Sequence, residues 1–100
     1  MALQINENAG ILEIRGSLNT QNANALKNYL EALISQSSFI IISLNKVKNM
    51  DKSSFDTLVS LYKKALAKNK VFYIISGKNK KVKHLFQSEK LNYMLHNQAA

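Results

Sequence analysis

Hydrophobic and polar residues change their spacing several times along the chain, and each spacing predicts a different element. Alternation in Ile11-Leu12-Glu13-Ile14-Arg15 predicts a strand over residues 10–16, paired with a shorter strand over residues 3–6. Asn8-Ala9-Gly10 between them is typical of a hairpin turn, and Gly16 is expected to end the second strand. The chain therefore begins with a predicted β-hairpin.

Two longer segments repeat their apolar residues at helical spacing. Residues 22–35 are predicted as the first helix, with Thr20 or Asn22 as its cap and residues 35–38 as the following loop. Its expected inward face consists of Leu26, Tyr29, Leu30, Leu33 and Ile34. The inward face expected for a second helix, over residues 55–66, consists of Phe55, Leu58, Val59, Tyr62, Ala65 and Leu66. Asn69 stands where a left-handed residue ends this helix.

Two nearly continuous apolar runs, residues 39–44 and 71–75, predict strands that are covered on both faces. Residues 76–79 lead into a last helix, which is expected to bury Val82, Leu85 and Phe86. Residues 91–95 are expected to add an edge strand. Parallel strands joined by helices belong to one sheet. The predicted class is therefore α/β, with the order β-β-α-β-α-β-α in a single mixed β-sheet, helices packed mainly on one side, and one domain over residues 1–100.

The composition excludes several kinds of site. The chain has no cysteine, so neither a disulfide nor a thiol nucleophile is present. No apolar run approaches the length of a membrane span and no signal peptide is visible, which favours a cytoplasmic protein without membrane insertion. His84 and His96 are isolated, and no catalytic triad, glycine-rich phosphate loop or zinc spacing occurs. We therefore expect no enzymatic activity, no cofactor and no metal.

Positive charge is concentrated in the second half of the chain. The formal net charge is +8, and residues 46–100 contain twelve lysines and no arginine. Because bidentate recognition of bases and phosphates depends mainly on arginine, specific nucleic-acid binding is not expected. Lys63, Lys64 and Lys68 are expected on a solvated helix face. Four lysines lie at the start of the last helix: Lys78, Lys80, Lys81 and Lys83. Positive charge at this end opposes the helix dipole, and the cluster therefore indicates an acidic partner.

Candidate chemistry lies at Met50-Asp51-Lys52-Ser53-Ser54-Phe55, between an apolar strand and a helix. The first N–H groups of that helix point outward, which suits either an ordinary cap or a site for a negative group. Ser53 and Asp56 fit a capping box. Asp51 is either the cap itself or an acidic residue presented to a partner, and the sequence leaves both open.

These residues and their order resemble the STAS domain, the fold shared by bacterial anti-sigma-factor antagonists and the tails of sulfate transporters. The resemblance spans nearly the whole chain. It rests on Ile14-Arg15-Gly16-Ser17-Leu18-Asn19, on the strand of residues 40–44 followed by Met50-Asp51, and on Val82-Lys83-His84-Leu85-Phe86. In the family, a kinase partner phosphorylates the serine that directly follows the aspartate, and the phosphate blocks docking.

Three positions depart from the family pattern. Lys52 stands at the regulatory serine, Ser54 at a glycine, and Asn19 at an acidic residue of the earlier loop. Lys52 cannot accept a phosphate in that way. Either Ser53 is the phosphorylation site, one residue on, or the protein is not switched by phosphorylation.

The resemblance implies a non-enzymatic protein-binding module that docks on an ATP-binding anti-sigma factor or serine kinase. The alternative is a STAS-type regulatory subunit of a transport ATPase, as in bacterial lipid ABC transporters, which needs no phosphorylation. A weaker third interpretation is a basic domain that binds RNA or a membrane surface. The expected partner-binding residues are Asn19, Asn49, Asp51, Lys52, Ser53, Ser54 and Thr57.

Overall fold

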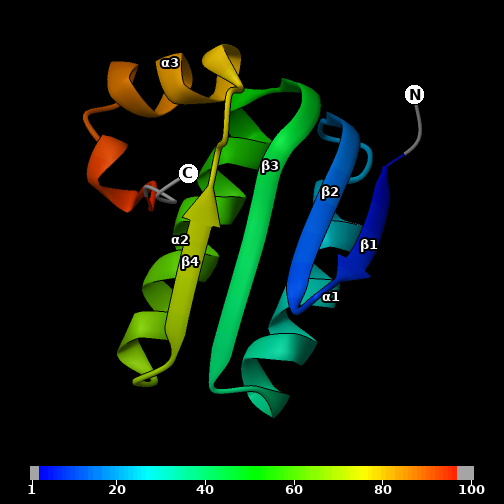
Figure 1. Cartoon of the computed structure of the whole chain (residues 1–100), viewed down its shortest axis with the longest axis vertical. Coiled ribbons are helices and arrows are strands. Elements are labelled where there is room, and N and C mark those ends of the chain that lie inside the picture. The colour runs from blue at the N-terminus through cyan, green and yellow to red at the C-terminus, as the bar shows by residue number, and fades with distance from the viewer. Residues whose placement is uncertain (1–2, 97–100) are drawn as a thin grey trace.

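A computed structural model describes residues 3–96 and shows a four-stranded sheet with three α-helices (Figure 1). The strands are β1 (Gln4–Asn8), β2 (Ile11–Leu18), β3 (Phe39–Met50) and β4 (Val71–Ile75), and they lie in the order β1-β2-β3-β4. The helices are α1 (Ala23–Gln36), α2 (Lys52–Ala67) and α3 (Lys80–Ser88), followed by a 3-10 turn η1 (Asn92–Met94). Only the β1–β2 pair is antiparallel. The predicted α/β class, mixed sheet and element order are confirmed.

The predicted hairpin is present, with a tight turn at Ala9 and Gly10. Both residues have positive φ, 53° and 81°, as a two-residue turn of the kind that suits twisted strands requires. The second strand does not end at Gly16, as the sequence predicted, but continues to Leu18. Gly16 instead lies at a register shift between β2 and β3 and has a φ of 98°. A glycine is suited to such a bulge because it lacks a Cβ.

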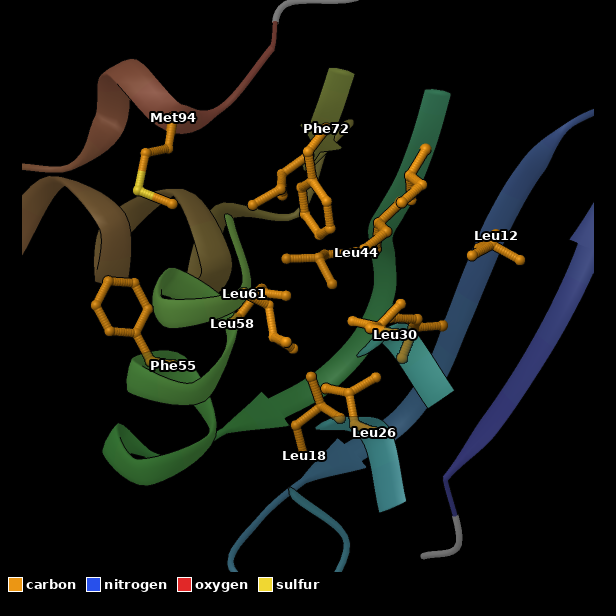
Figure 2. Packing of buried hydrophobic residues seen from close by; sticks show 14 of the residues in the cluster. Leu12, Leu18, Leu26, Leu30, Leu44, Phe55, Leu58, Leu61, Phe72 and Met94 are labelled. Atoms are coloured by element: carbon orange, nitrogen blue, oxygen red, sulfur yellow. The ribbon is translucent and has the colours of Figure 1, made fainter. Parts of the chain in front are cut away.

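Helices α1 and α2 cover one face of the sheet, and the core lies between the two layers (Figures 1 and 2). Leu26, Leu30 and Ile34 recur at helical spacing on α1 and are completely buried. Fully burying one such side chain stabilises the fold by about 1.5–3 kcal/mol. Tyr29 and Leu66, in contrast, are 42% and 48% exposed, so their predicted inward orientation is wrong. Both lie at the margin of the apolar stripe of their helix.

Strand β3 differs from its prediction in coverage and in length. Ile40, Ile42 and Leu44 are buried, whereas Phe39 is 55% exposed, because the helices cover only one face of the sheet. The prediction of a strand covered on both faces is therefore wrong. The strand also runs on through residues 45–50, beyond its predicted end, because pairing with β2 extends to Leu18 and Met50.

The chain after β4 turns across one end of the sheet as α3 (Figure 1). Val82 and Phe86 are buried as predicted, whereas Leu85 is only partly buried. The edge strand predicted for residues 91–95 is wrong, because most of this segment forms η1 and only Leu95 bridges to Ile74. Within residues 3–96, no helix combines the length and apolar character that crossing a bilayer requires.

Candidate functional site

Asp51 is the single residue between β3 and α2, and it caps the helix. Its backbone is extended, and its Oδ1 accepts a hydrogen bond of 2.9 Å from the Ser54 backbone N–H. This geometry satisfies one of the unpaired N–H groups in the first turn of α2. The predicted capping box of Ser53 and Asp56 is therefore wrong. Asp56 instead accepts a bond of 2.9 Å from Lys52 Nζ.

The same aspartate also binds the loop between β2 and α1. Its Oδ2 accepts from the Thr20 backbone N–H at 3.0 Å and from Thr20 Oγ1 at 3.2 Å. In addition, the Asp51 backbone N–H donates to the Leu18 carbonyl oxygen at 3.0 Å. The Ser54 N–H, assisted by the hydroxyls of Ser53 and Thr20, holds the pKa of Asp51 below its ordinary value. Asp51 therefore remains an anion that fixes two loops together.

The β2–α1 loop is organised by two asparagines. Asn19 Oδ1 accepts from the backbone N–H groups of Gln21 and Asn22. Asn22 Oδ1 accepts from the Asn19 N–H at 3.0 Å, and Asn22 Nδ2 donates to the Ser17 carbonyl oxygen at 2.7 Å. Asn22 thus occupies the N-cap position of α1 but makes no side-chain bond to the helix, while Thr20 binds Asp51. The prediction of Asn22 at the N-cap position is therefore confirmed, although its side chain makes no capping hydrogen bond, and Thr20 is not the cap.

Lys52, at the first position of α2, joins this helix to the end of α3. Its ammonium lies 2.9 Å from Asp56 Oδ1, 2.8 Å from Glu89 Oε1 and 5.2 Å from the centre of the Phe55 ring. The two carboxylates, Glu89 first, raise the pKa of Lys52. The ammonium is therefore charged and already engaged with local partners.

The remaining expected site residues divide into exposed and buried ones. Ser53 is exposed, and its Oγ donates to Asp51 Oδ1 at 3.1 Å and lies 3.4 Å from Thr20 Oγ1. Thr57, one turn later, donates to the Ser53 carbonyl oxygen, and Asn49 is exposed near the end of β3. Ser54 is completely buried. The expectation that its side chain contributes to a partner-binding surface is therefore wrong.

We refer to the accessible residues at this junction as the α2 corner: Asn19, Thr20, Asn49, Asp51, Lys52, Ser53 and Thr57. Thr20 was not expected among the site residues. Its position in the chain carries no signal for this role, because its contact with Asp51 depends on the tertiary arrangement of two loops. The corner presents hydroxyl, amide and carboxylate groups in a fixed arrangement, which suits recognition of another polar surface.

A second feature, missed in the sequence, is a groove of about 320 Å³ between the second half of β3 and α3. We call it the β3–α3 groove. It is lined by Val47, Lys48, Asn49, Met50, Lys81, Val82, His84, Leu85 and Ser88. It adjoins the α2 corner, because Asn49 belongs to both and Met50 directly precedes Asp51.

Asn79 holds α3 in the position that forms this groove. Its Nδ2 donates to the carbonyl oxygens of Leu44 and Val47 at 2.9 and 2.8 Å, and its Oδ1 accepts from the Val82 N–H at 3.2 Å. Gly77 precedes it with a φ of 59°, and an added Cβ there would lie 2.6 Å from Asn45 Oδ1. The turn therefore requires both a glycine and an asparagine.

The two histidines lie in different surroundings. Within the described part of the chain, no three His, Cys, Asp or Glu side chains gather as metal ligands. The His96 ring stacks on Tyr73 with a centroid distance of 4.1 Å, and His84 lies at the β3–α3 groove.

The sequence profile described as the STAS domain matches residues 1–98. No curated protein matches the sequence. Among solved structures, the anti-sigma factor antagonist SpoIIAA in its unphosphorylated form aligns with a TM-score of 0.74 at 17% identity, over 98% of this chain and 89% of that one.

Two further structures are similar. The Bacillus cell fate determinant SpoIIAA in the phosphorylated form has a TM-score of 0.71 at 16% identity, over 98% of this chain and 92% of that one. An anti-sigma factor antagonist from Mycobacterium paratuberculosis has a TM-score of 0.70 at 19% identity, over 96% and 86% of the two chains. At these identities the structural likeness establishes the fold.

Proposed function

This chain belongs to the STAS domain family, and on that premise we propose that it is a non-enzymatic regulatory module that acts by binding another protein through its α2 corner. The proposed partner is an ATP-binding anti-sigma factor or serine kinase, because the structures that this fold resembles include anti-sigma factor antagonists. The partner is proposed to be a protein because the basic half of the chain is rich in lysine and contains no arginine.

The observation that carries this proposal is the double role of Asp51. One carboxylate caps α2 and binds Thr20 on a separate loop, so the polar groups around it are already in place before a partner arrives. A rigid surface loses little conformational entropy on binding. Thr57 lies one turn after Ser53 on α2, and its hydroxyl donates to the Ser53 carbonyl oxygen, so both hydroxyls belong to this ordered surface.

We propose Ser53 as the phosphorylation site. Its hydroxyl is exposed in the first turn of α2. Lys52, in contrast, has no hydroxyl, and its ammonium is bound to two carboxylates. A phosphate on Ser53 would add roughly −1.5 to −2 charges beside the Asp51 carboxylate. It would compete with Asp51 for the helix N-terminus and disrupt the contact with Thr20, so docking would weaken.

A second candidate function is supported by the ion pairs of Lys52. In a regulatory subunit of a transport ATPase, no phosphorylation is needed, and a fixed lysine between Asp56 and Glu89 suits a permanent interface. The two candidates differ in what the partner is and in whether ATP changes the binding.

The test is affinity capture from native lysate with tagged wild-type protein, Ser53→Glu, Asp51→Ala and Ser60→Glu, followed by mass spectrometry. Ser60→Glu is a matched control, because Ser60 is also exposed on α2 but lies two helical turns beyond Ser53. We expect an ATP-binding kinase-like protein with the wild type and Ser60→Glu, and its loss with Ser53→Glu and Asp51→Ala. A partner that all four proteins retain equally would contradict docking at this corner.

Reconstitution with the purified partner separates the two candidates. The antagonist function predicts that ATP transfers phosphate to Ser53 and that this transfer is absent in Ser53→Ala. The transport function predicts a stable complex with an ATPase that ATP does not dissociate and that contains no phosphoserine. A captured nucleic acid lost at high salt would instead favour the basic-domain interpretation.

A further inference from the structure

The β3–α3 groove combines an apolar floor with a positively charged rim. We infer that it receives an acidic segment that carries apolar side chains, contributed by the same protein partner that docks on the α2 corner. This inference rests on the proposed function and adds the chemistry of the partner's second contact.

The floor of the groove is apolar and of limited size. Val47 and Val82 are buried at its base, and Met50 and Leu85 are partly exposed within it. Its volume of about 320 Å³ lies at the lower end of the range for small-ligand sites, roughly 300–1,000 Å³. Such a space suits a few apolar side chains of a peptide segment and is small for a lipid acyl chain.

The rim carries positive charge without local counter-charges. Lys48 and Lys81 are exposed on opposite sides of the groove, and within residues 3–96 neither forms an ion pair. Lys80 and Lys83 extend the charge along α3, whose first turn contains no acidic residue. Positive side chains at the positive end of a helix dipole raise the local potential further. An anionic partner would lower this repulsion.

A second copy of the chain is a poor source of that negative charge. The whole sequence contains six acidic residues. Asp51 caps α2, and four others are engaged in ion pairs: Glu13, Glu31, Asp56 and Glu89. The sixth, Glu7, is exposed on β1 and is a single charge without an acidic neighbour in the sequence. The acidic segment must therefore come from a different protein.

The position of the groove connects it to the proposed interface. Asn49 is part of both the groove and the α2 corner, and Met50 separates it from Asp51 by one residue. A protein that covers the corner is therefore placed to extend a neighbouring segment along α3. The polar corner would then select the partner, while the apolar floor would slow its dissociation.

The test selects binding peptides from a random phage-displayed library, so it applies whichever protein the partner is. The library is panned on the wild-type protein, and enriched peptides are measured by fluorescence anisotropy. We expect the enriched sequences to combine Asp or Glu with Leu, Ile or Phe. On peptide binding, the NMR chemical shifts of the backbone amides of Val47, Lys81 and Leu85 are expected to change. Lys81→Glu and Leu85→Gln are expected to weaken binding about tenfold or more, since each removes a groove contact.

Lys63→Glu is the matched control, because it makes the same charge change on the exposed side of α2, away from the groove. Lys81→Glu places an acid in the first turn of α3, where the helix dipole favours it, so the variant is expected to fold. Equal weakening by Lys63→Glu, enrichment of basic or neutral peptides, or shifts elsewhere on the surface would overturn the inference.

Vesicles provide the competing arm. Co-sedimentation with phosphatidylglycerol vesicles, but not phosphatidylcholine vesicles, that is lost in Lys81→Glu would assign the groove to a lipid surface and overturn the peptide assignment. Two results together would support the groove while contradicting the proposed corner function. Peptides would still bind the groove of Asp51→Ala, and Asp51→Ala would still capture the partner from lysate. If Asp51→Ala lost the lysate partner and no library peptide bound the groove, the corner function would be supported and the groove inference overturned.

Discussion

Lys52 Nζ lies 2.8 Å from Glu89 Oε1, so the first residue of α2 is tied to the residue that follows α3. The same ammonium binds Asp56, four residues along its own helix. Lys52 therefore links the start of α2 both to the next turn of its own helix and to the end of α3.

Replacing Lys52 with methionine is expected to lower the urea midpoint of unfolding slightly. The decrease should be smaller than that caused by Asp51→Ala, which removes the cap of α2. The side chain is exposed, so its ion pairs are screened by solvent and salt. The difference from wild type should shrink at about 1 M NaCl, where the Debye length falls to about 3 Å. Lys63→Met is the control, because within the described residues Lys63 forms no ion pair. A difference that does not respond to salt would show that packing of the stem, and not charge, is responsible.

Removal of the Asp51 carboxylate in Asp51→Ala is expected to destabilise the fold by about 1 kcal/mol, within the usual range of roughly 0.5–2 kcal/mol for a lost N-cap. Asp51→Asn keeps an oxygen for the Ser54 N–H and is expected to retain most of the stability. Urea unfolding at neutral pH measures both. Equal destabilisation by the two variants would indicate that the negative charge, and not the cap geometry, stabilises the corner.

The depressed pKa of Asp51 predicts a pH dependence with a definite sign. Since the folded protein binds this proton less tightly than the unfolded chain, the ionised carboxylate stabilises the fold above its ordinary pKa of 3.8. That contribution is lost as the pH falls below this value toward the lower pKa of the folded state. Wild-type protein should therefore lose more stability between neutral pH and about pH 3 than Asp51→Asn, measured by urea unfolding at each pH. Parallel losses in the two proteins would contradict the assignment.

Asn79→Ala is expected to destabilise the fold by about 1–3 kcal/mol, because it removes the cap of α3 and leaves carbonyl oxygens of β3 without their donor. In hydrogen exchange, Asn79→Ala should accelerate exchange of the backbone amides of α3, relative to the wild type, more than it accelerates exchange in α1. Asn6→Ala, at an exposed position on the edge strand β1, is the control and should change stability little. Unchanged exchange in α3 would mean that apolar packing alone holds this helix.

The rings of Phe55 and Phe86 meet edge to face, 4.9 Å between centroids, and join α2 to α3 within the core. A double-mutant cycle with Phe55→Leu and Phe86→Leu should give a coupling free energy of about 0.5–1.5 kcal/mol, the usual value for such a pair. The four proteins of the cycle are compared by urea unfolding. Additive effects would show that the two rings contribute only through their separate burial.

Much of the fold was predictable because it depends on local spacing. The alternation in β2 and the helical repeats of α1 and α2 reflect which side chains can share one face of a strand or helix. The hairpin turn at Ala9 and Gly10 and the left-handed Asn69 follow from backbone preferences. These signals lie within a few residues of one another, so the sequence by itself determined the elements and their order.

The tertiary structure decided how far the elements extend and which loops meet. Pairing with β2 carries β3 through polar residues 45–50, although their own composition does not favour a strand. The contact between Thr20 and Asp51 spans 31 residues, and that between Lys52 and Glu89 spans 37. The corner and the groove depend on sheet register and helix placement. No pattern of neighbouring residues predicts the sheet register or the helix placement, because both are set by the packing of the whole chain.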